Sequence, residues 1–265
     1  MMRYLAILAI LILSASGTTQ PPTSFVYVPA VTVNVVTYSP LKGVGLDARS
    51  GVNLNCGDSA SVGAGWWHNW SPSARGCASP GFVATVYSAA FLGQPAGGSG
   101  PMFGYNEPDR PDQANVTAAQ AAQATAQMLT LYPGRPIIGA TISHLGRAMY
   151  YPAYLAELDR LGVSGRLHGL SLNCYLSVPD CQAYVNQVRG WASQRGIPTV
   201  WLKEFRLDDV SQGQTMIEWL EANGIYYAWF ISRLPADQTR AGLWSAPLFD
   251  GAGQLTPHGT MYRAQ

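Results

Sequence analysis

Two glutamates, Glu107 and Glu204, each follow a short apolar run and could take part in acid–base chemistry. The first stands in Phe103-Gly-Tyr-Asn-Glu-Pro-Asp109, between an amide and a proline, and the second in Trp201-Leu-Lys-Glu-Phe205. Asn, Pro and Asp are ordinary turn formers, so each acid could simply mark a strand end or join a salt bridge. The elements that carry the two acids decide between this interpretation and a catalytic one.

Eight short apolar runs alternate with loops or helical segments after residue 40. The predicted strands span residues 41–47, 63–69, 82–87, 101–106, 136–142, 167–173, 198–204 and 224–230. Helical periodicity marks residues 117–131, 151–161, 179–194 and 211–223. Nearly continuous apolar strands that alternate with helices indicate a parallel sheet covered on its outside. Eight units predict an α/β fold, a (β/α)8 TIM barrel with some helices shortened or irregular.

The alternative fold is a doubly wound open sheet. Such a sheet needs a glycine-rich phosphate loop after its first strand, and Gly43-Val-Gly45 is too short to supply one. The barrel is therefore preferred.

In a barrel of this kind, active sites lie at the carboxyl ends of the strands. The fourth predicted strand ends at Asn106 and Glu107, the seventh ends at Glu204, and aromatic residues stand at other strand ends. Two carboxyl groups facing each other across flat rings suit cleavage of a glycosidic bond with retention. Lys203 should point out of this site, because neighbouring side chains along a strand alternate.

The composition and the amino-terminal segment together predict one exported domain. Hydrophobic residues make up 48% of the 265 and charged residues 12%, which allows a sizeable core, and the net charge of +1 argues against nucleic-acid binding. A basic start, a short apolar run and a small-residue exit predict a signal peptide over residues 1–17, removed on secretion. A linker or amino-terminal extension over 18–40 and a catalytic domain over 41–265 would follow. We expect a secreted or periplasmic monomer without membrane contact beyond the signal peptide.

The four cysteines, Cys56, Cys77, Cys174 and Cys181, fit an oxidising compartment. Four cysteines allow three pairings, among which the sequence cannot choose. The local pairs, Cys56 with Cys77 and Cys174 with Cys181, are preferred because short loops close at low entropic cost. No Cys-x-x-Cys motif occurs, so a zinc site is not expected, nor is any other metal or cofactor.

Five stretches, in chain order, resemble glycoside hydrolase family 128, secreted endo-β-1,3-glucanases of the retaining clan A with an Asl1-like catalytic core. They are Gly65-Trp-Trp-His-Asn-Trp70, Gly104-Tyr-Asn-Glu-Pro-Asp109 with Gln113-Ala-Asn115, Trp201-Leu-Lys-Glu-Phe205, Tyr227-Ala-Trp-Phe230 and Leu255-Thr-Pro-His-Gly259. The similarity runs from about residue 42 to the carboxyl terminus.

The resemblance implies a β-glucan substrate, with Glu107 as acid/base and Glu204 as the nucleophile that forms a covalent glycosyl intermediate. It also implies that Tyr175 holds Glu204 in its ionised, attacking orientation. The implied substrate-binding residues are Asn106 on the sugar 2-hydroxyl, Trp229 as the floor of the subsite at the cleavage point, and Trp66, Trp67 and Asn69 in neighbouring subsites.

The sequence departs from this family at Asn173-Cys174-Tyr175, where a His-Trp-Tyr stretch is usual. Two alternatives are open, and the departure is the reason for the first. The barrel could act on another β-linked polysaccharide, such as a mannan or xylan. It could also be a secreted glycan-binding protein without turnover, although the retained Asn106, Glu107 and Glu204 argue against that.

Overall fold

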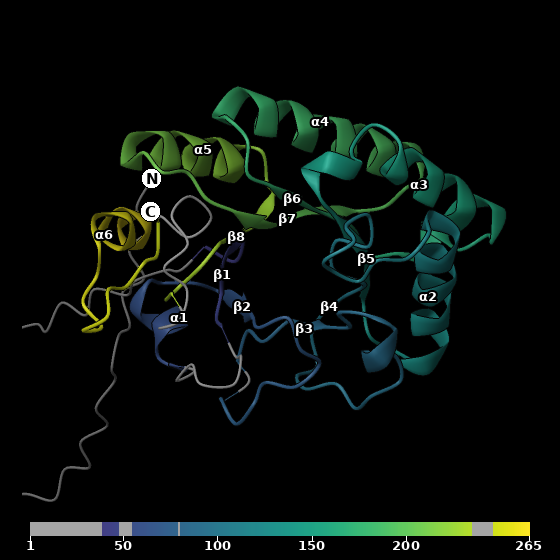
Figure 1. Cartoon of the computed structure of the whole chain (residues 1–265), viewed down its shortest axis with the longest axis horizontal. Helices are drawn as coiled ribbons and strands as arrows, with labels where there is room; N and C mark the ends of the chain where they lie inside the picture. Colours follow the sequence, from purple (N-terminus) through teal and green to yellow (C-terminus); the bar gives the residue numbers. More distant parts are fainter. Residues whose placement is uncertain (1–38, 48–54, 79, 235–245) are drawn as a thin grey trace, which may run out of the picture. The chain divides into compact units, whose positions relative to one another are not determined.

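The computed structural model describes residues 39–47, 55–78, 80–234 and 246–265 (Figure 1). The predicted signal peptide and the linker up to residue 38 lie outside the described residues. Within the described ranges, no helix is both long and apolar enough to cross a membrane.

Eight parallel strands form one sheet, in the order β2-β1-β8-β7-β6-β5-β4-β3. The strands are β1 (Lys42–Gly45), β2 (Trp66–His68), β3 (Ala84–Thr85), β4 (Met102–Phe103), β5 (Ile137–Ile142), β6 (Gly169–Cys174), β7 (Thr199–Phe205) and β8 (Tyr226–Trp229). The two edge strands are β2 and β3, and Trp67 of β2 forms an isolated parallel bridge with Phe82, two residues before β3. The sheet thereby closes nearly completely, and the predicted (β/α)8 barrel is confirmed.

Helices cover only part of the barrel. The helical elements are α1 (Asp58–Ser61), η1 (Ala89–Phe91), α2 (Ala118–Leu131), η2 (His144–Gly146), α3 (Tyr150–Arg160), η3 (Ser164–Arg166), α4 (Val178–Gln194), α5 (Val210–Ala222) and α6 (Pro257–Ala264). The long helices α2 to α5 lie outside the β5–β8 side, whereas loops surround β2 to β4 (Figure 1). The expectation of shortened or irregular helices is confirmed for these early units.

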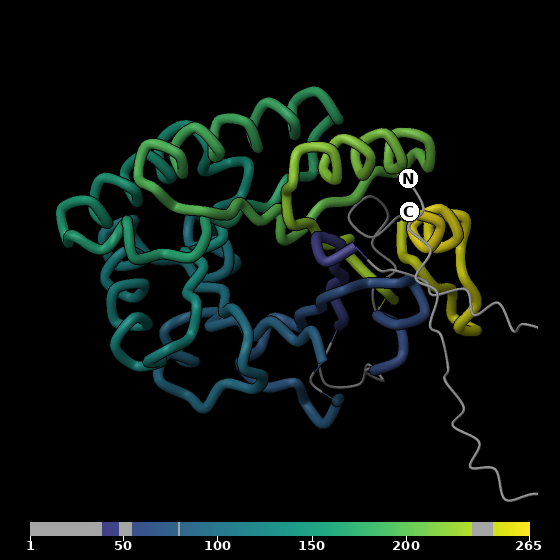
Figure 2. Tube along the Cα trace, turned by 180° about the vertical axis from the view of Figure 1, so that it is seen from behind, coloured from purple at the N-terminus to yellow at the C-terminus, as the bar shows by residue number. Residues whose placement is uncertain are grey.

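The carboxyl-terminal helix α6 was not predicted from periodicity. Thr256 is its N-cap and accepts a hydrogen bond from the Gly259 N–H at 3.0 Å, while Pro257 occupies the first helical position. A threonine followed by proline is a recognisable helix start, so this signal was present in the sequence. The helix lies beside α5 (Figure 2).

Helix α6 also covers β1. Lys42 on β1 is 2% exposed, and its ammonium group donates to the backbone carbonyl of Tyr262 at 2.5 Å. The Tyr262 hydroxyl donates in return to the carbonyl of Gly43. The first strand and the last helix are thus fixed to each other by two hydrogen bonds.

Side chains that point into the barrel fill it in layers, as is usual for this fold. At the amino ends of the strands, Trp66 meets Trp201 with ring centroids 5.0 Å apart, and Trp201 stacks on Tyr226 at 3.9 Å. A cavity of about 590 Å³ opens at this end, and these three rings are part of its lining together with His168. The next layer contains His68 and Phe103, with ring centroids 5.9 Å apart.

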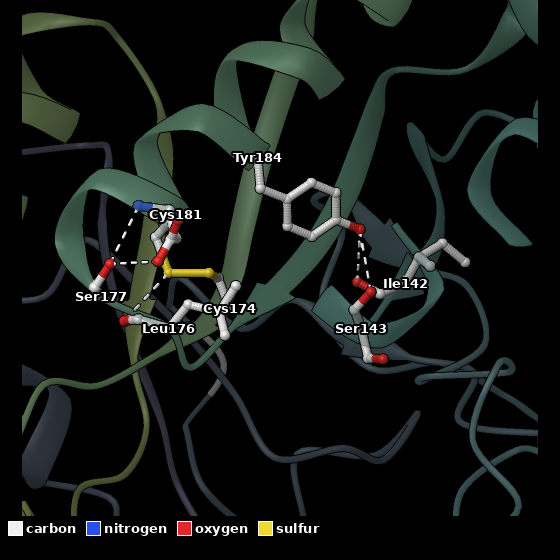
Figure 3. Close-up of a disulfide and its surroundings, with 8 residues drawn as sticks. Ile142, Ser143, Cys174, Leu176, Ser177, Cys181 and Tyr184 are labelled. Carbon is white, nitrogen blue, oxygen red and sulfur yellow. Dashed lines mark hydrogen bonds between the residues drawn. A yellow bond between two sulfur atoms is a disulfide. The ribbon is translucent and has the colours of Figure 1, made fainter. Parts of the chain in front are cut away.

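Both predicted disulfides are present. Cys56 bonds Cys77, and Cys174 bonds Cys181. The second bond joins the end of β6 to the first turn of α4 (Figure 3). On the same helix, the Tyr184 hydroxyl points to the carbonyls of Ile142 and Ser143 at the end of β5, at 3.4 and 3.2 Å. The start of α4 is therefore fixed against the carboxyl ends of two strands.

Candidate active site

Glu107 lies in a braced turn after β4. Its N–H donates to the carbonyl of Thr141 at 2.8 Å, and its φ of +40° is in the left-handed region, which is costly for a residue other than glycine. The Asp109 carboxylate accepts hydrogen bonds from the N–H of Ser143, at 3.1 Å, and from its hydroxyl. The turn-forming residues around Glu107 therefore anchor the acid to the end of β5.

Glu204 and Lys203 both point into the barrel, because β7 contains a bulge. Asn173 pairs with Glu204 while Leu172 pairs with Leu202, so Lys203 is an extra residue on β7. A bulge of this kind turns two consecutive side chains to one face. Lys203 is fully buried and its ammonium group lies 3.9 Å from Glu204 Oε1. The prediction that Lys203 points out of the site is wrong, because it assumed unbroken alternation.

Glu204 is held by two neutral donors. The indole N–H of Trp70 donates to Oε1 and the hydroxyl of Tyr175 to Oε2, both at 2.6 Å. Burial and the charges of Glu204 and Glu107 raise the pKa of Tyr175 well above its usual value, so the phenol keeps its proton and remains a donor. Glu204 is only 4% exposed. Both of its oxygens are thus fixed in position with little access to water.

Glu107 has the environment of a carboxyl group that retains its proton. Burial and, next, the charge of Glu204 raise its pKa to about 7, against the weaker opposing effects of Asn173 and Arg110. The Asn173 amide donates to Glu107 Oε1 at 2.9 Å, and Arg110 Nε lies 3.5 Å from Oε2. Asn173 contacts the proposed acid directly, a role that the sequence reasoning missed when it treated this residue only as a departure from the family pattern.

Asn106 is fixed from both ends. Its carbonyl oxygen accepts from Lys203 Nζ at 2.7 Å, and its NH2 group donates to Gln113 Oε1 at 3.3 Å. The hydroxyl of Tyr87 donates to the same Gln113 oxygen. The structure thus brings together Asn106, Glu107, Glu204 and Tyr175, which the sequence analysis assigned to one site.

Of the three aromatic rings beside Glu204, the resemblance implied only Tyr175. Trp70, Phe230 and Tyr175 form them, with the Phe230 ring centroid 5.6 Å from each of the other two. Alternation was the signal that could have found Trp70 and Phe230, because every second residue from Trp66 or from Tyr226 faces the same side.

Trp66, Trp67 and Trp229, which were expected at subsites, lie elsewhere, whereas Asn69 lies in the loop after β2, next to Trp70. Trp66 belongs to the layer at the amino ends of the strands, and the Asn69 amide donates to the carbonyl of Ser73 within its own loop at 2.9 Å. Trp67 packs on Phe82, and Trp229 packs on α6, outside the barrel interior. The indole N–H groups of Trp67 and Trp229 donate to backbone carbonyls, of Pro80 at 3.0 Å and Ala246 at 2.8 Å. The three tryptophans are therefore not in the places that the resemblance implied, and the place of Asn69 at a subsite stays a prediction.

The site consists of two buried carboxyl groups in unlike environments, at the carboxyl ends of the strands of a (β/α)8 barrel. This is the arrangement of a glycoside hydrolase. No group of three His, Cys, Asp or Glu side chains suited to a metal ion occurs in the described part of the chain. Residues 45–262 match the family described as glycosyl hydrolase catalytic core, and the chain belongs to this family. No curated protein matches the chain.

Solved structures with the same fold include several enzymes of glycoside hydrolase family 128. An endo-β-1,3-glucanase of subgroup I from Amycolatopsis mediterranei, in complex with laminaritriose, is 23% identical, with a TM-score of 0.65 over 84% of this chain and 98% of that one. A curdlan-specific exo-β-1,3-glucanase of subgroup III from Blastomyces gilchristii is 21% identical (TM-score 0.63; 84% and 97% covered). A subgroup II endo-β-1,3-glucanase from Pseudomonas viridiflava is 25% identical (TM-score 0.60; 86% and 98% covered).

Proposed function

We propose that this protein is a retaining endo-β-1,3-glucanase, with Glu107 as acid/base and Glu204 as nucleophile. The observation that carries the proposal is the contrast between the two carboxyl groups. Burial and the charge of Glu204 raise the pKa of Glu107 to about 7, whereas Glu204 accepts two hydrogen bonds at 2.6 Å. Two carboxyl groups in such different environments suit the roles of proton donor and attacking anion.

The reaction would proceed by double displacement. In the first step, Glu107 gives its proton to the glycosidic oxygen while a carboxylate oxygen of Glu204 attacks the anomeric carbon, and the leaving chain departs as an alcohol. In the second step, Glu107 takes a proton from water, the water oxygen attacks the same carbon, and the bond to Glu204 breaks. The NH2 group of Asn106 would donate to the 2-hydroxyl of the sugar, a contact that strengthens in the transition state.

The enzymes of the same fold support a β-1,3-glucan substrate, and two of the three described above act in the endo mode. The Amycolatopsis enzyme is an endo-β-1,3-glucanase bound to laminaritriose, and the Blastomyces enzyme is an exo-β-1,3-glucanase. We favour endo action on a linear β-1,3-glucan. Endo action predicts a rapid loss of viscosity and a spread of oligosaccharide lengths, whereas exo action would release one short product from the start.

The test is digestion of a linear β-1,3-glucan by the wild type, Glu107→Ala and Glu204→Ala. The matched control is Glu157→Gln on α3, whose carboxylate contacts Arg160 at 2.7 Å and lies outside the site. Both site variants should lose at least about 10³-fold in kcat, and the control should retain wild-type activity. Release of reducing sugar at the same background level by the wild type and Glu204→Ala would refute the proposal and favour a glycan-binding protein.

Azide provides a separate test of the two roles. It can replace water in the second step when the acid/base is missing, so Glu107→Ala with azide and an activated glucoside should give a β-glycosyl azide. Glu204→Ala lacks the nucleophile, and azide occupying its place should give the α-product. The opposite pattern would exchange the two roles.

We also propose that the chain is exported and that residues 1–17 are removed, on the evidence of its basic and apolar start. Amino-terminal sequencing of the protein recovered from the culture medium or periplasm tests this. A mature protein that still begins at Met1 would refute it.

A further inference from the structure

A fully buried lysine contacts the site, and the double displacement does not require it. Lys203 Nζ is 2.7 Å from Asn106 Oδ1, 3.9 Å from Glu204 Oε1 and 5.3 Å from the centre of the Phe103 ring. An ammonium group is costly to remove from water, so its burial needs partners that compensate. Asn106 and Glu204 both take part in the proposed reaction.

The first consequence concerns the orientation of Asn106. Lysine has only donors, so the atom of Asn106 that it contacts must be the carbonyl oxygen. The NH2 group therefore faces the other way, where it donates one hydrogen to Gln113 Oε1, with 3.3 Å between Nδ2 and Oε1. The second hydrogen remains for a hydroxyl of the substrate.

The second consequence concerns charge. Several elements contribute titratable groups around Lys203 and the two carboxyl groups. They are Glu204 and Arg206 at the end of β7, Glu107, Asp109 and Arg110 after β4, His68 on β2, Tyr87 after β3, His144 after β5 and Tyr175 after β6. Burial and the charge of Lys203 lower the pKa of His68 well below its usual value, so this ring is neutral. Burial lowers the pKa of Lys203 to about 8, against the charges of Glu204 and Glu107, so the ammonium is charged at neutral and acidic pH.

We propose that Lys203 is a positioning residue of the reaction, which turns the Asn106 amide toward the substrate and places a positive charge 3.9 Å from Oε1 of Glu204, the attacking group. This inference rests on the proposed function. Arg110, whose side chain is about one third exposed, lies near Glu107, so its charge is partly screened and is placed beside the wrong carboxyl group for this purpose.

The test compares Lys203→Met and Lys203→Gln with Lys42→Met. Lys42 is a matched control, because it is a lysine 2% exposed in the same barrel, and its ammonium group contacts Tyr262 instead of the site. An opposite charge within 4–6 Å favours the ionised form of a carboxyl group by about 1–3 pKa units. Both Lys203 variants should therefore shift the acidic limb of the kcat/KM profile to higher pH by about one unit, and kcat/KM should fall by about 10- to 100-fold.

Lys203→Gln keeps a donor for Asn106 and loses the charge, so it should recover part of kcat/KM relative to Lys203→Met while the acidic limb remains shifted. Lys42→Met should leave the profile unchanged. An unshifted acidic limb in both folded Lys203 variants would overturn the proposal, as would an equal shift in Lys42→Met.

A measurement on the wild type separates this inference from the glucanase assignment and does not need the variants to fold. The carbon next to the Lys203 amine can be followed by NMR in the free protein. It should titrate near pH 8 and report an ammonium group at pH 6. A neutral amine at pH 6 would overturn the inference even if the protein cleaves β-1,3-glucan. A charged lysine in a protein that cleaves no glycan would refute the proposed function alone.

Discussion

Replacing Glu107 by glutamine should make the protein more stable at neutral and alkaline pH, with little effect at acidic pH. Burial and the charge of Glu204 raise the pKa of Glu107 from 4.5 to about 7, so the folded protein binds this proton more tightly than the unfolded chain. Below pH 4.5 the group is protonated in both states and costs nothing. As the pH rises, the unfolded chain loses the proton first, and the folded state is progressively destabilised until the pH passes about 7.

The magnitude follows from the two pKa values. Each pKa unit is worth about 1.36 kcal/mol, so the change from 4.5 to about 7 corresponds to about 3 kcal/mol. Glu107 is 7% exposed, so solvent screens little of this cost. For a domain of this size, 1 kcal/mol shifts Tm by about 2–4 °C, which predicts a Tm about 6–12 °C higher for Glu107→Gln at pH 8 and nearly equal values at pH 4.

Differential scanning calorimetry of the wild type and Glu107→Gln at both pH values measures this effect. Glu157→Gln, on the outer face of α3, makes the same chemical change away from the site and should give a small difference at both pH values. A gap between wild type and Glu107→Gln that is the same at pH 4 and pH 8 would refute the reasoning. So would a variant that is less stable at pH 8.

Four further outcomes are expected. The kcat/KM profile should fall on its alkaline side with an apparent pKa of about 7, because Glu107 must carry a proton; a profile that is flat from about pH 4 to 9 would contradict this. Tyr175→Phe removes a hydrogen bond to Glu204 and should lower kcat by about 10- to 100-fold with little change in Tm, so a wild-type kcat would count against its role. Trp229→Phe should lower Tm and leave KM unchanged, because this ring packs on α6; a large rise in KM would instead place it at a subsite. Replacing Cys174 and Cys181 by serine should cost about 2.5 kcal/mol of stability, visible as a lower denaturation midpoint, and an unchanged midpoint would show that the bond contributes nothing.

The fold was predictable because its signal is repeated along the chain. Most of the buried parallel strands read as nearly continuous apolar runs, and three of the long helices, α2, α4 and α5, begin with a capping side chain. Thr117, for example, forms a capping box with Gln120 at the start of α2. The early units were harder, because β3 and β4 are each only two residues long and are flanked by loops. Short strands of this kind depend on neighbours that are distant in sequence.

The site was predictable in its acids and less so in its aromatic residues. Glu107 and Glu204 follow from counting strands, because parallel strands all end at the same rim. Which of two adjacent rings faces inward depends on the phase of the alternation along the strand. An error of one residue in that phase places Trp229 inside the barrel instead of Phe230. The inward position of Lys203 depends on a bulge whose register comes from β6 and β8, so no local pattern could reveal it.

The hydrogen bonds between β1 and α6 have a consequence for the order of assembly. Lys42–Val44 pair with Tyr227–Trp229 of β8, 185 positions further along the chain, and Lys42 hydrogen-bonds to helix α6, 220 positions away at Tyr262. During synthesis, the segment that becomes β1 leaves the ribosome long before anything can bury its lysine. Closure of the ring must therefore be a late event, and the aromatic interior stays accessible to chaperones or to other nascent chains until then.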